Sequence, residues 1–268
     1  MNDLLTGGSA AVISRTATAP LELFKIQRQN SFMPYSTLRA VLQREGVSYL
    51  WKGNGTNCMR AFPQFAITYA LFERSKTSVF ADVKYTALQN FLCGAVSGMT
   101  AMAIIYPMET ARSRLTLQSQ NSHYASLGDA LRQMRVREMY RGLGMSLLGF
   151  GPYNAFSFMF YHQLPPLLER TGLSETNRKL LGGGLAGIGA VSITYPTDLV
   201  RRRLQLQGFD DSVPVYTGIR DCVRKIMHLE GFRGLYRGLF ATYIKLFPTT
   251  AIQFWVIEKG NHLFKNKH

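Results

Sequence analysis

Acidic, basic and amide side chains with helical spacing follow a long uncharged stretch of the chain. Asp198, Arg201 and Gln205 are three and then four residues apart, so on a helix all three project from one face. The preceding residues, 180–197, contain no Asp, Glu, Lys or Arg. Ionisable groups at the end of an apolar segment are costly at membrane depth unless they pair or face water, which makes them candidates for a binding or gating site. The alternative is a solvated helix face with a local ion pair.

The same pattern occurs three times along the chain. A proline is followed by an acid two residues later and by a base five residues later at Pro20, Pro107 and Pro196. An aromatic–basic–glycine element follows each pattern, and another proline lies ten residues beyond its glycine. These elements are Trp51-Lys52-Gly53, Tyr140-Arg141-Gly142 and Tyr236-Arg237-Gly238, followed by Pro63, Pro152 and Pro248. A repeat of this length indicates one structural unit built from three similar parts.

Two uncharged segments, 85–108 and 142–168, are long enough to cross a bilayer of about 30 Å. The mean hydropathy of −0.04 would also suit a soluble helical protein, but the local pattern favours membrane-spanning helices. We predict an all-α membrane protein with six transmembrane helices in three pseudo-threefold repeats and short surface helices. The repeats are expected at 1–82, 83–172 and 173–268, in one structural domain. The long helices are expected near 4–30, 56–80, 85–118, 142–169, 174–207 and 239–264, and the surface helices near 36–44, 126–137 and 218–229.

The composition indicates an anionic partner. The chain has 31 Lys+Arg against 16 Asp+Glu, a formal charge of +15, which suits nucleic acid, anionic lipid or small anionic solutes. Cys58, Cys93 and Cys222 lack metal-ligand spacing and are expected to be buried apolar residues. Clustered His/Cys ligands, a Gly-rich phosphate loop and a Ser/His/Asp arrangement are all missing from the sequence, so we expect neither an enzyme nor a cofactor. The N-terminus leads directly into an apolar segment, so no cleavable targeting peptide is expected.

These motifs resemble the signature of the mitochondrial carrier family (solute carrier family 25 type), P-x-D/E-x-x-K/R-x-K/R-x-Q followed by an aromatic-K/R-Gly element. The third repeat matches every position through Gln205. The first repeat has Gln27 where a base is usual and keeps Gln29. The second keeps Arg114 but has Thr116 where glutamine is usual. The resemblance covers nearly the whole chain and implies a multi-pass protein of the mitochondrial inner membrane.

The resemblance also implies a gate on the matrix side, closed by ion pairs between the repeats. The expected pairs are Glu22 with Arg112, Glu109 with Arg201, and Asp198 with Lys25, braced by Gln29 and Gln205. Substrate binding would offset the free energy of these pairs and open the gate; the alternative is a permanent ion-pair clasp. On the cytoplasmic side the family expects F/Y-D/E-x-x-K/R motifs. The matching residues are Phe72, Glu73 and Lys76, with Glu258 in an incomplete third motif, so we predict a weak outer gate.

Substrate selection in this family occurs near the midpoint of the pore, deeper than the gate acids. The residues concerned lie three positions before the prolines of the second, fourth and sixth long helices, here Arg60, Gly149 and Lys245. Arg15 adds a third cation at a similar depth, while Phe150 and Tyr153 add an apolar and aromatic wall. Phosphates need convergent cations, and a purine ring needs a flat apolar surface. The combination resembles the coenzyme A, ATP-Mg/phosphate and related adenine-nucleotide carriers.

We therefore expect an inner-membrane transporter that exchanges nucleotide-type anions, such as adenine nucleotides or coenzyme A, by alternating access. The alternative substrates are thiamine pyrophosphate, phosphate or another small anion. A remote alternative is a soluble basic helical repeat that binds nucleic acid, but such proteins present Lys and Arg on an outer or concave face rather than after an uncharged run.

The three aromatic–basic–glycine elements open helices, and a helix N-terminus attracts phosphate. The family resemblance implies that the anion bound there is cardiolipin. The alternative for these elements is a helix cap with an interfacial aromatic. One chain contains a complete set of repeats, so a monomer would suffice.

Overall fold

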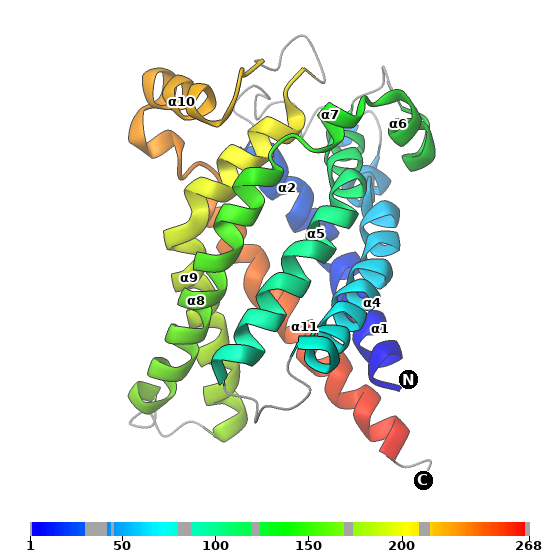
Figure 1. The fold of residues 1–268 in the computed structure, drawn as a ribbon, viewed down its shortest axis with the longest axis vertical. Helices are drawn as coiled ribbons and strands as arrows, with labels where there is room; N and C mark the ends of the chain where they lie inside the picture. The colour runs from blue at the N-terminus through cyan, green and yellow to red at the C-terminus, as the bar shows by residue number, and fades with distance from the viewer. Residues whose placement is uncertain are drawn as a thin grey trace.

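The computed structural model describes residues 2–29, 42–43, 46–79, 87–118, 124–168, 174–208 and 215–265. Every regular element within these ranges is a helix, and the long helices run roughly along the long axis of the molecule (Figure 1). The elements are α1 (Asn2–Ala17), α2 (Ala19–Gln29), the short 3-10 helix η1 (Val47–Trp51), α4 (Asn54–Val79), α5 (Ala87–Leu117), α6 (Leu127–Gln133), α7 (Val136–Met139), α8 (Leu143–Leu168), α9 (Glu175–Leu206), α10 (Ile219–Gly234) and α11 (Leu239–Lys265).

The long helices form a closed ring of three repeats. α4 packs on α5, α8 on α9, and α11 on α1, so each pair joins the second long helix of one repeat to the first of the next. Figure 1 shows α8 and α9 side by side on one side of the molecule and α1 beside α4 on the other. Small residues allow these close approaches: a Cβ atom on Gly189 of α9 would lie 2.8 Å from the ring of Phe160 on α8.

The helices that carry the three signature motifs, α2, α5 and α9, meet at one end of the ring. α2, α5 and α9 contact one another, and the surface helices α6, α7 and α10 lie beyond them, while both chain termini lie at the opposite end (Figure 1). Pro107 and Pro196 lie inside α5 and α9, and Pro20 follows the break between α1 and α2 at Thr18. The signature motifs of the three repeats therefore converge.

The surface helices differ in detail from the expected ranges. The predicted helix at 126–137 is two helices, α6 and α7, because Met134 and Arg135 have extended backbone angles. α10 continues to Gly234 and contains a non-helical residue, Gly231, with φ +68°. The helix expected at 36–44 lies outside the described residues except for 42–43.

One described segment, Leu92–Leu117 in α5, is long and apolar enough by length and composition to cross a membrane. The core helix of a soluble protein can have the same length and composition.

The glycine of each aromatic–basic–glycine element allows one repeat to pack closely against a neighbouring repeat. Gly53, Gly142 and Gly238 have φ of +77°, +87° and +89°, in the left-handed region that side chains with a Cβ rarely adopt. A Cβ at these positions would meet Thr116 of the second repeat, the Arg201 carbonyl of the third and Gln29 of the first, respectively. The contacts run cyclically around the ring, so these glycines fix the spacing between repeats.

Replacing Gly142 by alanine is therefore expected to destabilise the protein by at least about 2 kcal/mol. The alanine would have to keep the φ of +87° that is unfavourable for a residue with a Cβ. Its Cβ would lie 2.9 Å from both the Arg201 carbonyl oxygen and the Tyr106 hydroxyl. Thermal unfolding of the detergent-purified protein should show a Tm about 4–8 °C lower. The matched control is Gly144→Ala, where the Cβ would meet only the Ile219 methyl at 3.7 Å; an equal loss in both variants would contradict this role for Gly142.

Candidate functional site

Two adjoining cavities lie inside the ring of helices. The first has a volume of about 340 Å³ and the second about 260 Å³, and both are lined by Lys245 and Thr249 of α11. Sites for small ligands usually measure about 300–1,000 Å³. The two cavities together therefore offer space for a single ligand of nucleotide size, with Lys245 between its two parts.

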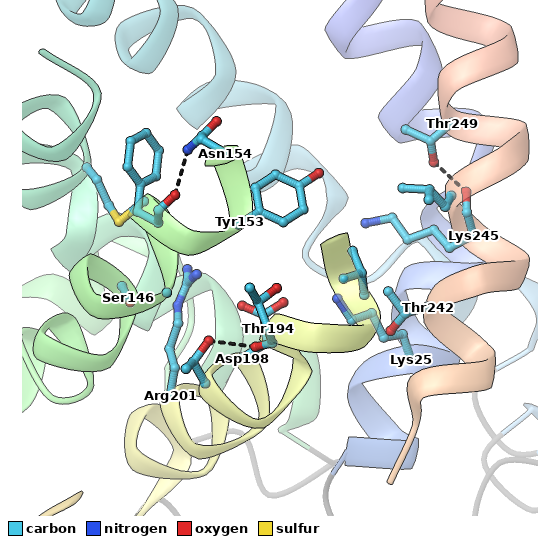
Figure 2. A pocket seen from close by; sticks show the side chains of 16 residues that line it. Lys25, Ser146, Tyr153, Asn154, Thr194, Asp198, Arg201, Thr242, Lys245 and Thr249 are labelled. Atoms are coloured by element: carbon cyan, nitrogen blue, oxygen red, sulfur yellow. Dashed lines mark hydrogen bonds between the residues drawn. The ribbon is translucent and has the colours of Figure 1, made fainter. Parts of the chain in front are cut away.

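The first cavity combines an apolar wall with charged groups. Figure 2 shows Tyr153 and Asn154 of α8 on one side, and Lys245 of α11 and Lys25 of α2 on the other, with Asp198 and Arg201 projecting from α9. Phe150 and Gly149 also line this cavity. Its walls come from all three repeats.

Gly149 allows α8 to approach α9 closely. A Cβ atom at this position would lie 2.5 Å from the Thr197 hydroxyl oxygen. The Phe150 ring packs against Gly98 of α5, where a Cβ would lie 2.7 Å from the ring. Two glycines thus set the shape of the apolar wall.

The second cavity is strongly basic. Its ionisable lining comprises Arg15, Glu22, Arg60, Glu109, Arg112, Arg202 and Lys245. The first cavity adds Lys25, Asp198 and Arg201. Seven basic side chains against three acidic ones leave an excess of four positive charges in the joined cavities.

Glu22 and Glu109 each bind two cations. Arg112 Nη2 lies 3.3 Å from Glu22 Oε1, and Lys245 bonds the other oxygen of the same carboxylate. Glu109 pairs with Arg201, and Arg60 Nη1 lies 3.2 Å from its Oε2.

The sequence-based expectation placed Arg60 and Lys245 deeper in the path, apart from the gate acids. The structure instead brings these two substrate-site cations onto Glu109 and Glu22. The expected gate and the expected substrate site therefore form one connected layer of charges.

Lys25 and Asp198 differ from the other two expected pairs. Both residues line the first cavity, but their charged atoms form no ion pair within 4.0 Å, although both side chains belong to the described part of the chain. Their charges still attract each other across the cavity. The α2–α9 corner is thus the least tightly closed of the three in this structure.

The remaining predicted residues of this region form hydrogen bonds with uncharged groups, and Gln205 also accepts one from Arg202. Arg15 Nη1 donates to the Asn57 carbonyl oxygen at 2.8 Å and to its side-chain oxygen at 3.4 Å. Gln29 donates to the Tyr195 hydroxyl at 3.2 Å, and Gln205 accepts from Ser113 at 3.4 Å. Both glutamines are fully buried where the three repeats meet.

Sequence reasoning missed Arg202 and Asn57 as lining residues of the second cavity. Arg202 had a detectable signal, because it lies four residues after Asp198 and so shares its helix face. The family signature directs attention to Arg201 and Arg203 instead. Asn57 had no comparable signal, since its role depends on the contact between α1 and α4.

The aromatic–basic–glycine elements make specific contacts within the ring. Trp51 donates its indole N–H to the Thr16 carbonyl oxygen at 3.0 Å. Tyr140 stacks on Tyr106 and Tyr236 on Tyr195, with ring centroids 6.4 and 6.3 Å apart.

The basic residues of these elements also have protein partners. Lys52 donates to the Gln118 carbonyl at 2.9 Å and Arg141 to the Gln207 carbonyl at 3.5 Å, both in the next repeat. Arg237 pairs with Glu230 of its own repeat at 3.4 Å. These cations lie at the helix ends where the elements were expected to bind lipid.

The residues expected at the cytoplasmic gate lie toward the opposite end of the helices. Phe72 of α4 is half-buried, with its ring 3.9 Å from the position of a Cβ on Gly94 of α5, and Glu73 is exposed. The side chains of Lys76 and Glu258 lie outside the described residues.

The three cysteines take no part in this site. Cys93 and Cys222 are buried and Cys58 is half-buried, and all three are free thiols. Burial raises the pKa of the Cys222 thiol in α10 to about 12, so the thiolate needed for nucleophilic attack or metal binding is scarce at neutral pH. The described residues contain no group of three His, Cys, Asp or Glu side chains suited to a metal ion.

Comparison with known proteins gives matches over almost the whole chain. Residues 1–82, 83–171 and 174–268 each match the family model described as mitochondrial carrier protein. The mitochondrial adenine nucleotide transporter ADNT1 of Arabidopsis thaliana is 35% identical over 95% of this chain and 84% of its own length. Solute carrier family 25 member 16 of Mus musculus is 33% identical over 98% and 88%. The mitochondrial adenyl nucleotide antiporter SLC25A24 of Danio rerio is 33% identical over 95% of this chain and 56% of its own length.

The three matching segments are the same three repeats that close around the charged cavities. Because the match extends over all of them, the chain belongs to the mitochondrial carrier family, a family of transporters, and is a multi-pass protein of the mitochondrial inner membrane.

Proposed function

We propose that this carrier exchanges nucleotide-type anions, such as adenine nucleotides, coenzyme A or a similarly phosphorylated cofactor, by alternating access through six transmembrane helices. The observation that carries the proposal is the excess of four positive charges in the joined cavities beside an apolar, aromatic wall. The names of two relatives, both adenine nucleotide transporters, support the same substrate class.

The charges and the wall suit different parts of such a substrate. Arg60, Lys245 and Arg15 offer hydrogen-bond donors to phosphate oxygens, and guanidinium groups bind phosphate in a bidentate manner. Gly149, Phe150 and Tyr153 offer a flat apolar surface to the base. A small dicarboxylate would use the cations but leave the wall without a partner.

Binding and gate opening are linked through shared cations. A phosphate group that binds Lys245 and Arg60 competes with Glu22 and Glu109 for the same positive charges. Each carboxylate would keep only its second partner, Arg112 or Arg201, so the free energy holding the matrix gate closed would fall. The substrate thereby weakens the gate by its differential binding to these cations.

The remaining roles complete this proposal. Lys25 with Asp198 forms the third pair of the matrix gate, braced by Gln29 and Gln205. Phe72, Glu73, Lys76 and Glu258 contribute a weak gate on the cytoplasmic side. Cardiolipin phosphate binds at the helix N-termini beside the aromatic–basic–glycine elements, and one chain acts as a monomer.

Exchange assays in liposomes test the substrate class. Purified protein is reconstituted into vesicles loaded with one of a panel: adenosine mono-, di- and triphosphate, coenzyme A, thiamine pyrophosphate, inorganic phosphate or malate. We expect uptake of labelled adenine nucleotide to require an internal nucleotide or coenzyme A. Preference for thiamine pyrophosphate or phosphate would move the carrier to another anion class, and preference for malate over every nucleotide would overturn the proposal.

A further inference from the structure

Arg202 breaks the threefold symmetry of the matrix gate. It is the sixth residue after Pro196, and the equivalent residues after Pro20 and Pro107 are Ile26 and Ser113. The first two repeats thus place an uncharged, buried side chain where the third places an arginine. A substrate without threefold symmetry is bound by the positions at which the repeats differ, so this position is a candidate ligand.

The hydrogen bonds of Arg202 are made to uncharged groups. Its Nη1 atom donates to the Ser113 hydroxyl at 2.5 Å and to the Gln205 side-chain oxygen at 3.3 Å. Within the described part of the chain no carboxylate lies within 4.0 Å of its guanidinium. In the same cavity Arg60, Arg112 and Lys245 are each bonded to a carboxylate. Arg202 is thus held in place by neutral oxygens, and an anion would not have to displace a carboxylate from its guanidinium.

The residues that line the two cavities suggest which part of the substrate lies in each cavity. Gly149, Phe150 and Tyr153 line the first cavity, Lys245 lines both cavities, and Arg202 lines the second. A substrate whose base rests on the apolar wall passes its phosphates by Lys245 before they reach Arg202. Arg202 lines only the second cavity, away from the apolar wall, so it would face the part of the phosphate chain beyond Lys245.

We infer that Arg202 binds the terminal phosphate of a nucleoside di- or triphosphate, or the most distant phosphate of a similar cofactor, and so selects for the length of the phosphate chain. This inference rests on the proposed function and names a specificity residue of the same site. The competing role is a structural brace, in which Arg202 only holds Ser113 and Gln205 together across α5 and α9. The two roles predict different substrate dependence.

Exchange kinetics of Arg202→Gln in liposomes separate these roles. With adenosine triphosphate, KM should rise about 10-fold or more, because a charge-assisted hydrogen bond to phosphate is lost. With adenosine monophosphate, which does not reach Arg202, KM should change less than about 2-fold. Arg202→Lys should recover part of the triphosphate preference, since it keeps the charge and loses the bidentate geometry.

The matched control is Ser113→Ala, which removes an anchoring hydroxyl and leaves the arginine in place. We expect this variant to keep the triphosphate-to-monophosphate KM ratio of the unmodified protein. Equal KM changes for all three adenosine phosphates in Arg202→Gln, or a loss of maximal rate with unchanged KM values, would show a brace and overturn the inference. If Arg202→Gln does not fold, the KM ratio of Arg202→Lys decides: an unchanged ratio overturns the inference, and a reduced one supports it.

The unmodified protein, measured in the same vesicles, keeps this test apart from that of the proposed function. Absence of any nucleotide exchange there would refute the proposed function itself. Nucleotide exchange together with an undiminished triphosphate preference in Arg202→Gln would refute the role of Arg202 alone.

Discussion

Reversing the charge of Asp198 to lysine is expected to lower the exchange rate at least about 100-fold, and the second change Lys25→Asp should restore most of it. The single change places two cations opposite each other across the first cavity, and an uncompensated buried charge costs about 3–5 kcal/mol. The double change recreates an acid and a base at the same two positions. Initial rates of nucleotide exchange in liposomes measure both effects.

The Glu22 and Arg112 pair provides the contrasting case. Glu22→Arg with Arg112→Glu also exchanges an acid and a base, but the new arginine at position 22 would face Lys245, which now bonds the Glu22 carboxylate. We therefore expect weaker recovery here than for Lys25 and Asp198, neither of which has an ion pair within 4.0 Å among the described residues. Full recovery of both swaps would contradict the shared-cation arrangement, and failure of both would contradict a gate made of exchangeable pairs.

The three-repeat helical architecture could be predicted because the same motifs occur three times in the sequence. Each repeat has the signature proline, an acid two residues later, a base five residues later and an aromatic–basic–glycine element. All three repeats therefore predict the same local structure, and an error in one is corrected by the other two. The family resemblance drawn from these motifs is confirmed by matches to all three repeats. The ends of the long helices were predicted within a few residues, because the apolar and charged segments alternate sharply. The exception is the single helix expected at 4–30, which is divided at Thr18 into α1 and α2.

The ion pairs that join the expected gate residues to the expected substrate-binding residues could not be predicted from the sequence. Arg60 lies on α4 and its partner Glu109 on α5, and Lys245 lies on α11 while Glu22 lies on α2. Whether such side chains meet depends on the separation and rotation of packed helices, which a linear pattern does not encode. Long flexible side chains add several possible partners for each position.

Positions at which the three repeats differ can identify residues that the shared signature does not. Arg202 lies between two signature positions and matches neither its counterpart Ile26 nor Ser113. A search for agreement among repeats passes over this residue, whereas a search for differences identifies it.

Equilibrium binding to Glu22→Gln is the most direct test of the claim that substrate and gate compete for the same cations. Removing the carboxylate charge frees Lys245, so the Kd for adenosine triphosphate, measured by calorimetry on the purified protein, should fall about 10-fold. Glu138→Gln serves as the control, because Glu138 pairs with the buried Arg114 at 3.2 Å and neither residue lines the cavities. Tighter binding in Glu22→Gln with an unchanged Kd in Glu138→Gln is the result we predict; an unchanged or weaker affinity in Glu22→Gln would contradict the competition on which this account depends.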